Sequence, residues 1–120
     1  IYFPLAEYYI YRGDLFYKLG NSISAIADYE KALSYLSIYK DSYKDLQSRC
    51  YQVVDRIASN YSKLGEFQRA IRKYDLITEN DSTSSLLDHI YTKKAVLKRK
   101  LGDVQGAIHD EAKAQNLKNE

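Results

Sequence analysis

The chain has 120 residues, of which 45% are hydrophobic and 28% charged, a composition typical of one globular domain and not of a disordered segment. Its formal net charge is +2, and neither half has the basic excess that nonspecific nucleic-acid binding needs. One cysteine excludes an intramolecular disulfide and favours a reducing compartment such as the cytoplasm, and no apolar run approaches the roughly 20 residues of a membrane-spanning helix. Since the chain begins at Ile1 without methionine, we expect an excised or processed piece.

The first third of the chain predicts two helices. Pro4 fits the first turn of a helix, where its missing N–H costs nothing. Apolar side chains then recur at helical spacing until Gly20 ends the helix: Leu5, Tyr8, Tyr9, the stem of Arg12, Phe16 and Leu19. Asn21 or Ser22 caps a second helix, whose buried face we expect to contain Ile23, Ile26, Tyr29, Leu33 and Leu36.

The middle of the chain needs a turn, because one helix from Asn21 to Leu64 would be abnormally long for a globular protein. We place the turn at residues 40–42, where Ser42 and Asp45 resemble a capping box. A third helix then runs over about 43–64 with an inward face of Leu46, Cys50, Val54, Ile57, Ala58 and Tyr61. The fourth helix follows Gly65 and carries Phe67, Ala70, Ile71, Tyr74 and Ile77.

The last third begins with a polar loop over residues 80–85, whose short side chains compete with the backbone for hydrogen bonds. Ser85 with Asp88 would cap a fifth helix over about 86–101, and a sixth follows over about 103–117. The sequence therefore predicts an all-α domain spanning 1–120, with three antiparallel helical hairpins at about 5–39, 43–79 and 85–117.

A short motif recurs at the bend of each hairpin. Lys-Leu-Gly, followed after four residues by Ala-Ile, begins at Lys18, Lys63 and Lys100. A glycine just past an amphipathic run supplies the left-handed conformation that ends a helix, and a second helix starts within a few residues. Three copies in so short a chain indicate a repeat protein.

The units resemble the tetratricopeptide repeat, a helix-turn-helix of about 34 residues read as Trp-x2-Leu-Gly-x2-Tyr, then Ala-x3-Phe, a further Ala and Pro. The first unit starts at Ala6 and gives Tyr9, Arg12, Gly13, Phe16, Ala25, Tyr29 and Ala32 at these positions. The second starts at Tyr51 and gives Val54, Ile57, Ala58, Tyr61, Ala70, Tyr74 and Ile77. The third starts at Asp88 and gives Tyr91, Lys94, Ala95, Lys98, Ala107, Glu111 and Ala114. Lys98 and Glu111 replace aromatic residues, and the closing proline is absent throughout.

The resemblance implies a right-handed α-α superhelix, or solenoid. Small residues on the first helix of each pair would meet alanines on the second: Gly13, Ala58 and Ala95 against Ala25, Ala70 and Ala107. The glycine bends lie 45 and 37 residues apart, and the first spacing exceeds the usual one by about three helical turns. We expect this surplus to lengthen the second and third helices and make their junction protrude, lined by Tyr35, Tyr39 and Tyr43.

In that family the inner surface of the superhelix, built from the first helix of each pair, binds an extended or helical peptide. The positions carried over are Glu7, Ile10, Asp14 and Tyr17, then Gln52, Asp55, Ser59 and Ser62, and finally His89, Thr92, Val96 and Arg99. The alternative is that these side chains are merely solvated. One form of the family clamps the C-terminal carboxylate of heat-shock chaperones with a Lys, two Asn and two basic residues. Ile10, Asp14, Arg56, His89 and Lys93 stand there, which disfavours that clamp.

Two other binding surfaces need weighing. One candidate for RNA binding is a basic run, but its members point in several directions along a helix and no stacking aromatic residues interleave with them: Lys93, Lys94, Lys98, Arg99 and Lys100. A solvated face is the alternative that we favour. Tyr2, Tyr8 and Tyr11 would suit a partner or self-association surface if exposed, whereas packing against the next helix is the competing interpretation.

No pattern in the sequence points to catalysis. There is no nucleophile and base motif, no phosphate-binding glycine loop and no paired-carboxylate signature, and we expect no cofactor. His89 and His109 lack partners at metal-ligand spacing, and Cys50 sits at core spacing. We therefore expect a non-catalytic module that binds a protein or peptide ligand. The alternative is a homo-oligomer that self-associates through the apolar ends of the array.

Overall fold

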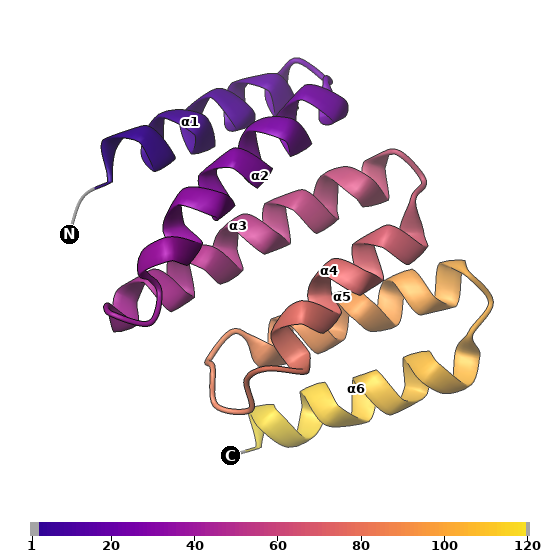
Figure 1. Ribbon diagram of the computed structural model, residues 1–120. Coiled ribbons are helices and arrows are strands. Elements are labelled where there is room, and N and C mark those ends of the chain that lie inside the picture. The colour runs from indigo at the N-terminus through magenta and orange to yellow at the C-terminus, as the bar shows by residue number, and fades with distance from the viewer. Residues whose placement is uncertain (1–2, 120) are drawn as a thin grey trace.

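The computed structural model describes residues 3–119, which form six α-helices and no strand (Figure 1). The helices are α1 (Pro4–Lys18), α2 (Ser22–Tyr39), α3 (Lys44–Lys63), α4 (Phe67–Thr78), α5 (Leu87–Lys100) and α6 (Val104–Lys118). Each helix packs mainly on the next along the chain, so the six form one stack from α1 to α6. The predicted all-α fold of helices packed in sequence is confirmed.

Three glycines end the first helix of each pair, as the sequence predicts. Gly20, Gly65 and Gly102 have φ of 80°, 77° and 85°, the left-handed region that side chains with a Cβ disfavour. After Gly20, the Asn21 N–H donates to the Phe16 carbonyl at 2.8 Å, and the other two bends make the same bond. These bonds satisfy carbonyls at the helix ends and turn the chain back on itself.

The two connections without glycine are less well predicted. The turn at residues 40–42 is confirmed, because α2 ends immediately before it. The capping boxes at Ser42 and Ser85 are wrong. The N-cap residues are Tyr43 and Leu86, and neither side chain makes a cap hydrogen bond. A helix capped by Ser42 or Ser85 would begin at the next residue, but α3 and α5 each begin two residues after the serine. The serine hydroxyl is therefore out of reach of the unpaired N–H groups in the first turn.

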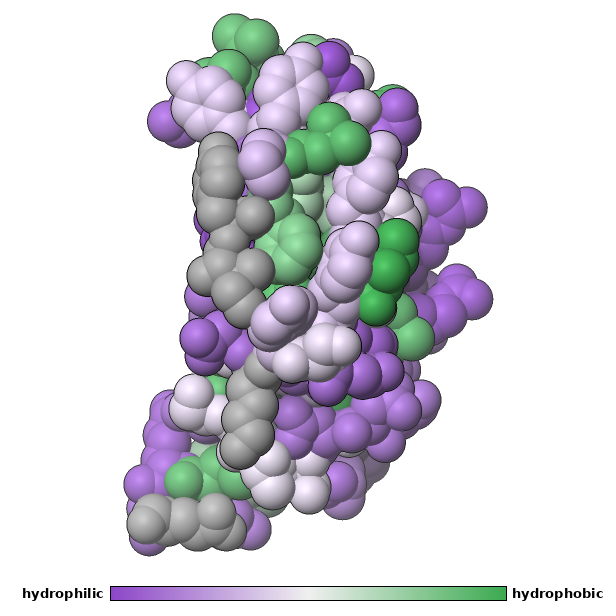
Figure 2. All heavy atoms as spheres, turned by 60° about the vertical axis from the view of Figure 1, so that its left-hand side comes forward, coloured by the Kyte–Doolittle hydropathy of each residue, from purple (hydrophilic) through white to green (hydrophobic). Residues whose placement is uncertain are grey.

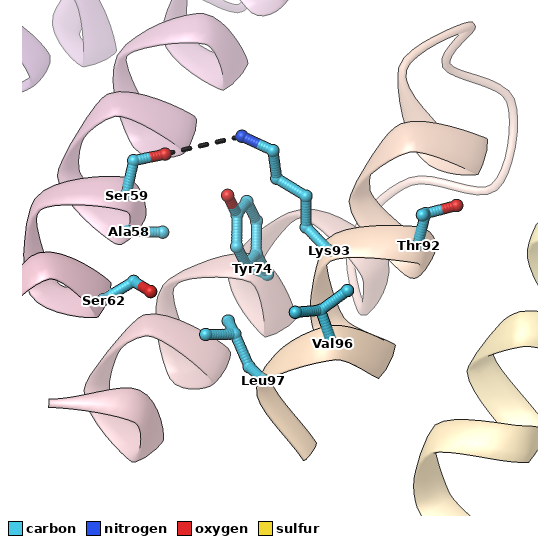
Figure 3. Close-up of a pocket in the computed structure, with 8 residues that line it drawn as sticks. All are labelled: Ala58, Ser59, Ser62, Tyr74, Thr92, Lys93, Val96 and Leu97. Carbon is cyan, nitrogen blue, oxygen red and sulfur yellow. Dashed lines mark hydrogen bonds between the residues drawn. The ribbon is translucent and has the colours of Figure 1, made fainter. Parts of the chain in front are cut away.

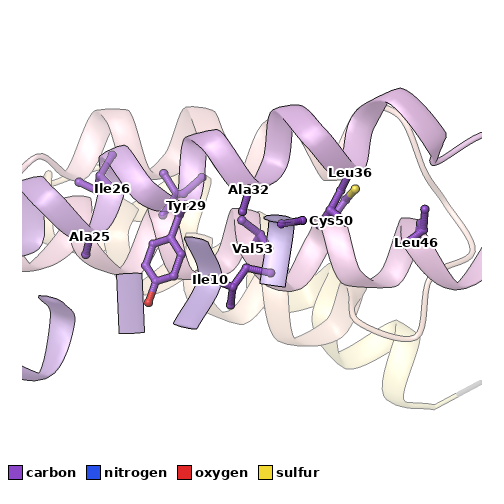
Figure 4. Close-up of a cluster of buried hydrophobic side chains, with 11 residues drawn as sticks. Ile10, Ala25, Ile26, Tyr29, Ala32, Leu36, Leu46, Cys50 and Val53 are labelled. Atoms are coloured by element: carbon purple, nitrogen blue, oxygen red, sulfur yellow. The ribbon is translucent and has the colours of Figure 1, made fainter. Parts of the chain in front are cut away.

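The sequence predicts small, buried residues where the two helices of each hairpin meet. Gly13, Ala58 and Ala95 are all buried, as are Ala25, Ala70 and Ala107. Larger apolar side chains form two core clusters, which include Ala25, Ala58 and Ala70. Figure 4 shows the first, in which α3 packs against the α1–α2 hairpin through Leu46, Cys50 and Val53. The predicted burial of Cys50 is confirmed at 5% exposure.

The buried face of the first hairpin differs from the prediction. In α1 the buried residues are Ala6, Ile10 and Gly13, whereas Leu5 and Tyr8 are half-exposed. The close approach of α1 and α2 at Gly13 explains this choice, since small residues let the two backbones meet and turn the larger side chains outward. In α2 the prediction that Ile23 faces inward is wrong, because its side chain is 71% exposed.

The long spacing between the first two bends lengthens two helices, as predicted. α2 has 18 residues and α3 has 20, against 12 to 15 in the others. Aromatic rings gather where the end of α2 meets the start of α1. Phe3 stacks on Tyr39 with ring centroids 5.1 Å apart, and Tyr9 stacks on Tyr35 at 6.0 Å. Tyr8 and Tyr11 are 50% and 66% exposed, and the predicted contribution of Tyr2 lies outside the described residues.

Candidate functional site

Ion pairs join the first helices of successive hairpins. Between α1 and α3, Arg49 Nη2 lies 2.7 Å from Glu7 Oε2, and Arg56 Nε lies 3.2 Å from Asp14 Oδ1. Between α3 and α5, Asp55 contacts Lys93 Nζ at 3.2 Å and His89 Nε2 at 3.5 Å. These contacts hold α1, α3 and α5 beside one another, so their side chains form one face.

Two of the carboxylates on this face are also held from within their own hairpin. The hydroxyl of Tyr29 on α2 donates to Asp14, and that of Tyr74 on α4 donates to Asp55. The pKa of both tyrosines is raised, mainly because the rings are buried and also because each hydroxyl donates to a carboxylate. Burial would raise the pKa of Asp55, but the Tyr74 hydroxyl and Lys93 outweigh burial and lower it. Each carboxylate thus links the two helices of its hairpin to the next hairpin.

A polar hollow of about 230 Å³ lies between α1 and α3. Its lining is Asp14, Tyr17, Tyr29, Asp55, Arg56, Ser59 and Asn60. Asn60 is 1% exposed and donates to the Arg56 carbonyl at 2.8 Å, while its Oδ1 has no hydrogen-bond partner among residues 3–119. The hollow therefore contains a buried acceptor in addition to two carboxylates.

A second hollow, of about 300 Å³, lies between α3 and α5 and is mostly apolar (Figure 3). Figure 3 shows Tyr74 at its centre, with Ser59 and Ser62 projecting from α3 and Val96 and Leu97 from α5. Ala58, Thr92 and Lys93 complete the lining, and Lys93 Nζ lies 3.5 Å from Ser59 Oγ. Because Ser59 lines both hollows, the two adjoin across α3.

Of the twelve residues predicted for this face, seven line the two hollows: Asp14, Tyr17, Asp55, Ser59, Ser62, Thr92 and Val96. The other five line neither hollow. Ile10 is 2% exposed in the core and offers no surface, because α1 turns that side toward α2. Glu7 and Arg99 are engaged in ion pairs, Gln52 accepts from Arg49, and His89 lies beside Asp55.

The second helices of the hairpins also contribute to this face, which the sequence pattern did not indicate. Tyr29 and Tyr74 were assigned to packing, yet both also line the hollows and hold a carboxylate. A buried tyrosine needs a partner for its hydroxyl, and Asp14 and Asp55 are two of the predicted groove residues that can accept a hydrogen bond. That requirement could have linked the two sets.

The basic run on α5 is neutralised by acidic residues. Lys93 contacts Asp55, Lys94 contacts Asp75 at 2.6 Å, Lys98 contacts Asp110 at 2.8 Å and Arg99 contacts Glu111 at 2.6 Å. Lys100 lies over the Phe67 ring at 5.2 Å. The prediction that these side chains point in several directions is confirmed. The prediction that the basic run is a solvated face is wrong for Lys94, whose side chain is only 8% exposed.

Metal and membrane sites are not apparent in the described part of the chain. Among residues 3–119, no three or more His, Cys, Asp or Glu side chains are grouped so as to hold a metal ion. None of the six helices combines the length and apolar character that crossing a membrane requires. Compared with models of known protein families and with curated proteins, the chain matches none.

Proposed function

We propose that this chain is a non-catalytic protein-interaction module of the tetratricopeptide type, which binds an extended peptide or partner helix across α1, α3 and α5. Three helical hairpins with glycine bends and small residues at their crossings support the resemblance. A right-handed superhelix belongs to the same proposal, with this face on its inner side.

The observation that carries the proposal is the pair of adjoining hollows on this face. One is polar and lies between α1 and α3; the other is mostly apolar and lies between α3 and α5. An apolar hollow beside a few fixed polar groups is the arrangement that ligand sites favour. Val96, 50% exposed, offers apolar area at the second hollow, and Asp14 and Asp55 supply fixed charges at the first. A peptide lying across α3 would place an apolar side chain against Val96 and polar atoms against the first hollow.

The charges on this face support a protein partner over RNA or a terminal carboxylate. RNA binding needs free cations, and four of the five residues in the basic run already contact carboxylates. A carboxylate clamp would need donors where Ile10 is buried and where Asp14 bears a negative charge. Neither alternative has an observation that favours it.

A matched pair of substitutions tests the site. A random-peptide display library is selected on the purified chain, and the recovered peptides are titrated against wild type, Val96→Glu and Leu76→Glu. Val96 and Leu76 are 50% and 51% exposed, but Leu76 lies on α4 away from both hollows. A carboxylate at the apolar hollow should weaken binding at least about tenfold, because the peptide's apolar side chain would then bury a charge. Leu76→Glu should leave binding unchanged.

Two results would count against the proposal. One is a library that yields no peptide binding the wild-type chain. The other is a set of peptides that bind Val96→Glu and wild type equally, which would place the interaction on another surface. Circular dichroism of each variant checks that the helices remain intact.

A further inference from the structure

The outer side of α1 carries an apolar stripe that nothing in the described structure covers. Leu5, Tyr8 and Leu15 follow each other at helical spacing, and their side chains are 49%, 50% and 41% exposed. The buried residues Ala6 and Ile10 lie on the opposite side of the same helix. In Figure 2, pale and green residues gather over the upper part of the molecule, where α1 and α2 lie, and purple residues dominate below. α1 is therefore apolar on both sides.

The same positions are buried in the later units. Counting from the unit starts at Ala6, Tyr51 and Asp88, the stripe corresponds on α3 to Cys50, Val53 and Asn60, which are 5%, 0% and 1% exposed. On α5 it corresponds to Leu87, Ile90 and Leu97, which are 2%, 1% and 5% exposed. Cys50 and Val53 share a core cluster with α1 and α2, and the three α5 residues share one with α3 and α4. These positions are therefore the surface that a preceding hairpin covers.

The other half of this contact is open at the far end of the stack. The covering surface comes in part from the second helix of the preceding hairpin, where Ile26 on α2 and Ile71 on α4 are 9% and 5% exposed. The corresponding residue on α6 is Ile108, which is 47% exposed. Val104, one turn earlier on α6, is also 47% exposed. An interface that occurs twice inside the chain thus has one open half at each end.

We propose that a second copy of this chain covers the α1 stripe with its α6, repeating the contact that α2 makes with α3 and α4 makes with α5. The α4–α5 contact sets the register. Ile71 and Leu97 lie in one cluster, and Lys94 contacts Asp75. By equivalence, Ile108 of one copy meets Leu15 of the next. The surfaces that meet differ, so the contact runs head to tail and does not close as a two-fold dimer does.

Charges at the new junction are compatible with burial. At the internal junctions a carboxylate faces a cation, as in Asp14 with Arg56. The corresponding pair at the new junction is Val96 of one copy and Tyr11 of the next, 50% and 66% exposed, so no charge there lacks a partner. Arg12 lies within the α1 stripe, but its guanidinium already donates to Asp28 at 2.7 and 2.8 Å. Burial of these three side chains therefore leaves no unpaired ion, whose burial would be costly.

Complementary end variants test the proposal, and because neither Leu15 nor Ile108 lines the two hollows, the test does not depend on peptide binding. Leu15→Glu blocks the α1 end and Ile108→Glu blocks the α6 end, and both side chains are more than 40% exposed, so the fold should tolerate either change. Sedimentation velocity should show the wild-type mass rising with concentration. Each variant alone should remain a monomer, with association weakened at least about tenfold by the buried carboxylate. An equimolar mixture should form a dimer and nothing larger, because each copy retains one usable end.

The control is Leu76→Glu on α4, which should associate like wild type. A dimer in the mixture also shows that both end variants are folded. If wild type stays monomeric at its highest soluble concentration, the proposal is overturned, and any helix that covers the α1 stripe must come from something other than a second copy. A dimer of Ile108→Glu alone overturns it in favour of a two-fold contact through α1. Oligomers of unchanged size in both variants place the association elsewhere.

Discussion

Substituting Gly13 by alanine should destabilise the protein, although alanine is the better helix former. A Cβ at position 13 would lie 2.7 Å from Cε1 and 2.9 Å from Cδ1 of Tyr29. That ring is 1% exposed and its hydroxyl is held by Asp14, so it has little freedom to move away. Overpacking of this kind costs about 1–3 kcal/mol, against a gain of about 0.5–1 kcal/mol from helix propensity. We expect a net loss of about 1–2 kcal/mol.

Urea denaturation and thermal melting followed by circular dichroism measure this loss. The Tm should fall by roughly 4–10 °C for a domain of this size. Ala27→Gly, at an exposed position of α2, measures the propensity term alone and should cost about 1 kcal/mol. In a Tyr29→Leu background, Gly13→Ala should become neutral or stabilising, since the ring that it meets is gone. A single variant as stable as wild type would refute the reasoning, because the close contact would then cost nothing.

Three further predictions concern ionisable groups that are buried or held in ion pairs. Asp55→Asn should make the Tm fall less steeply as pH is lowered in the acid range. The lowered pKa of Asp55 means that its contribution is complete above the unfolded value of 3.8 and is lost as pH falls through the folded one; a profile parallel to wild type argues otherwise. Lys98→Ala should cost about 3 kcal/mol in urea denaturation, because it strands the Asp110 carboxylate, which is 3% exposed; Asp110→Asn should recover part of this, and no recovery would contradict the pairing. Burial raises the pKa of the Cys50 thiol, which should react with a thiol reagent at least about 100-fold faster in urea than in buffer; equal rates would mean an open core.

The helix ends marked by glycine are predictable because only one residue type suits them. Gly20, Gly65 and Gly102 adopt positive φ, and the alanine that follows each bend is buried against the first helix. Helix length requires a turn between residues 21 and 64, and the apparent capping box at Ser42 places it correctly at 40–42, although the helix is not capped there. Serine, tyrosine and leucine can all precede a helix, so the neighbouring side chains decide where such a helix starts.

Which side of α1 is buried could not be read from periodicity, because the helix has apolar residues on both sides. The larger ones, Leu5 and Tyr8, favoured one side, but Gly13 permits close approach on the other and takes Ala6 and Ile10 inward with it. The same ambiguity removed Ile10 from the predicted groove. Groove positions on α3 were predicted better, three of the four lining a hollow, since helices on both sides leave α3 little choice of face.

The third unit departs from the pattern of the other two in a physically consistent way. Lys98 and Glu111 stand where the earlier units have aromatic residues, and both make ion pairs between α5 and α6, with Asp110 and with Arg99. An aromatic residue contributes most when hairpins enclose it on both sides, as Tyr74 is enclosed between α3 and α5. Within the described chain α6 has a neighbour on one side only, so ion pairs at the rim hold it where a ring would remain half-exposed. The apolar residues that α6 nevertheless exposes, Val104 and Ile108, lie one helical turn apart. Because the position of Ile108 faces a following hairpin in the earlier units, its exposure supports the proposed contact with another copy better than it supports degeneration of the repeat.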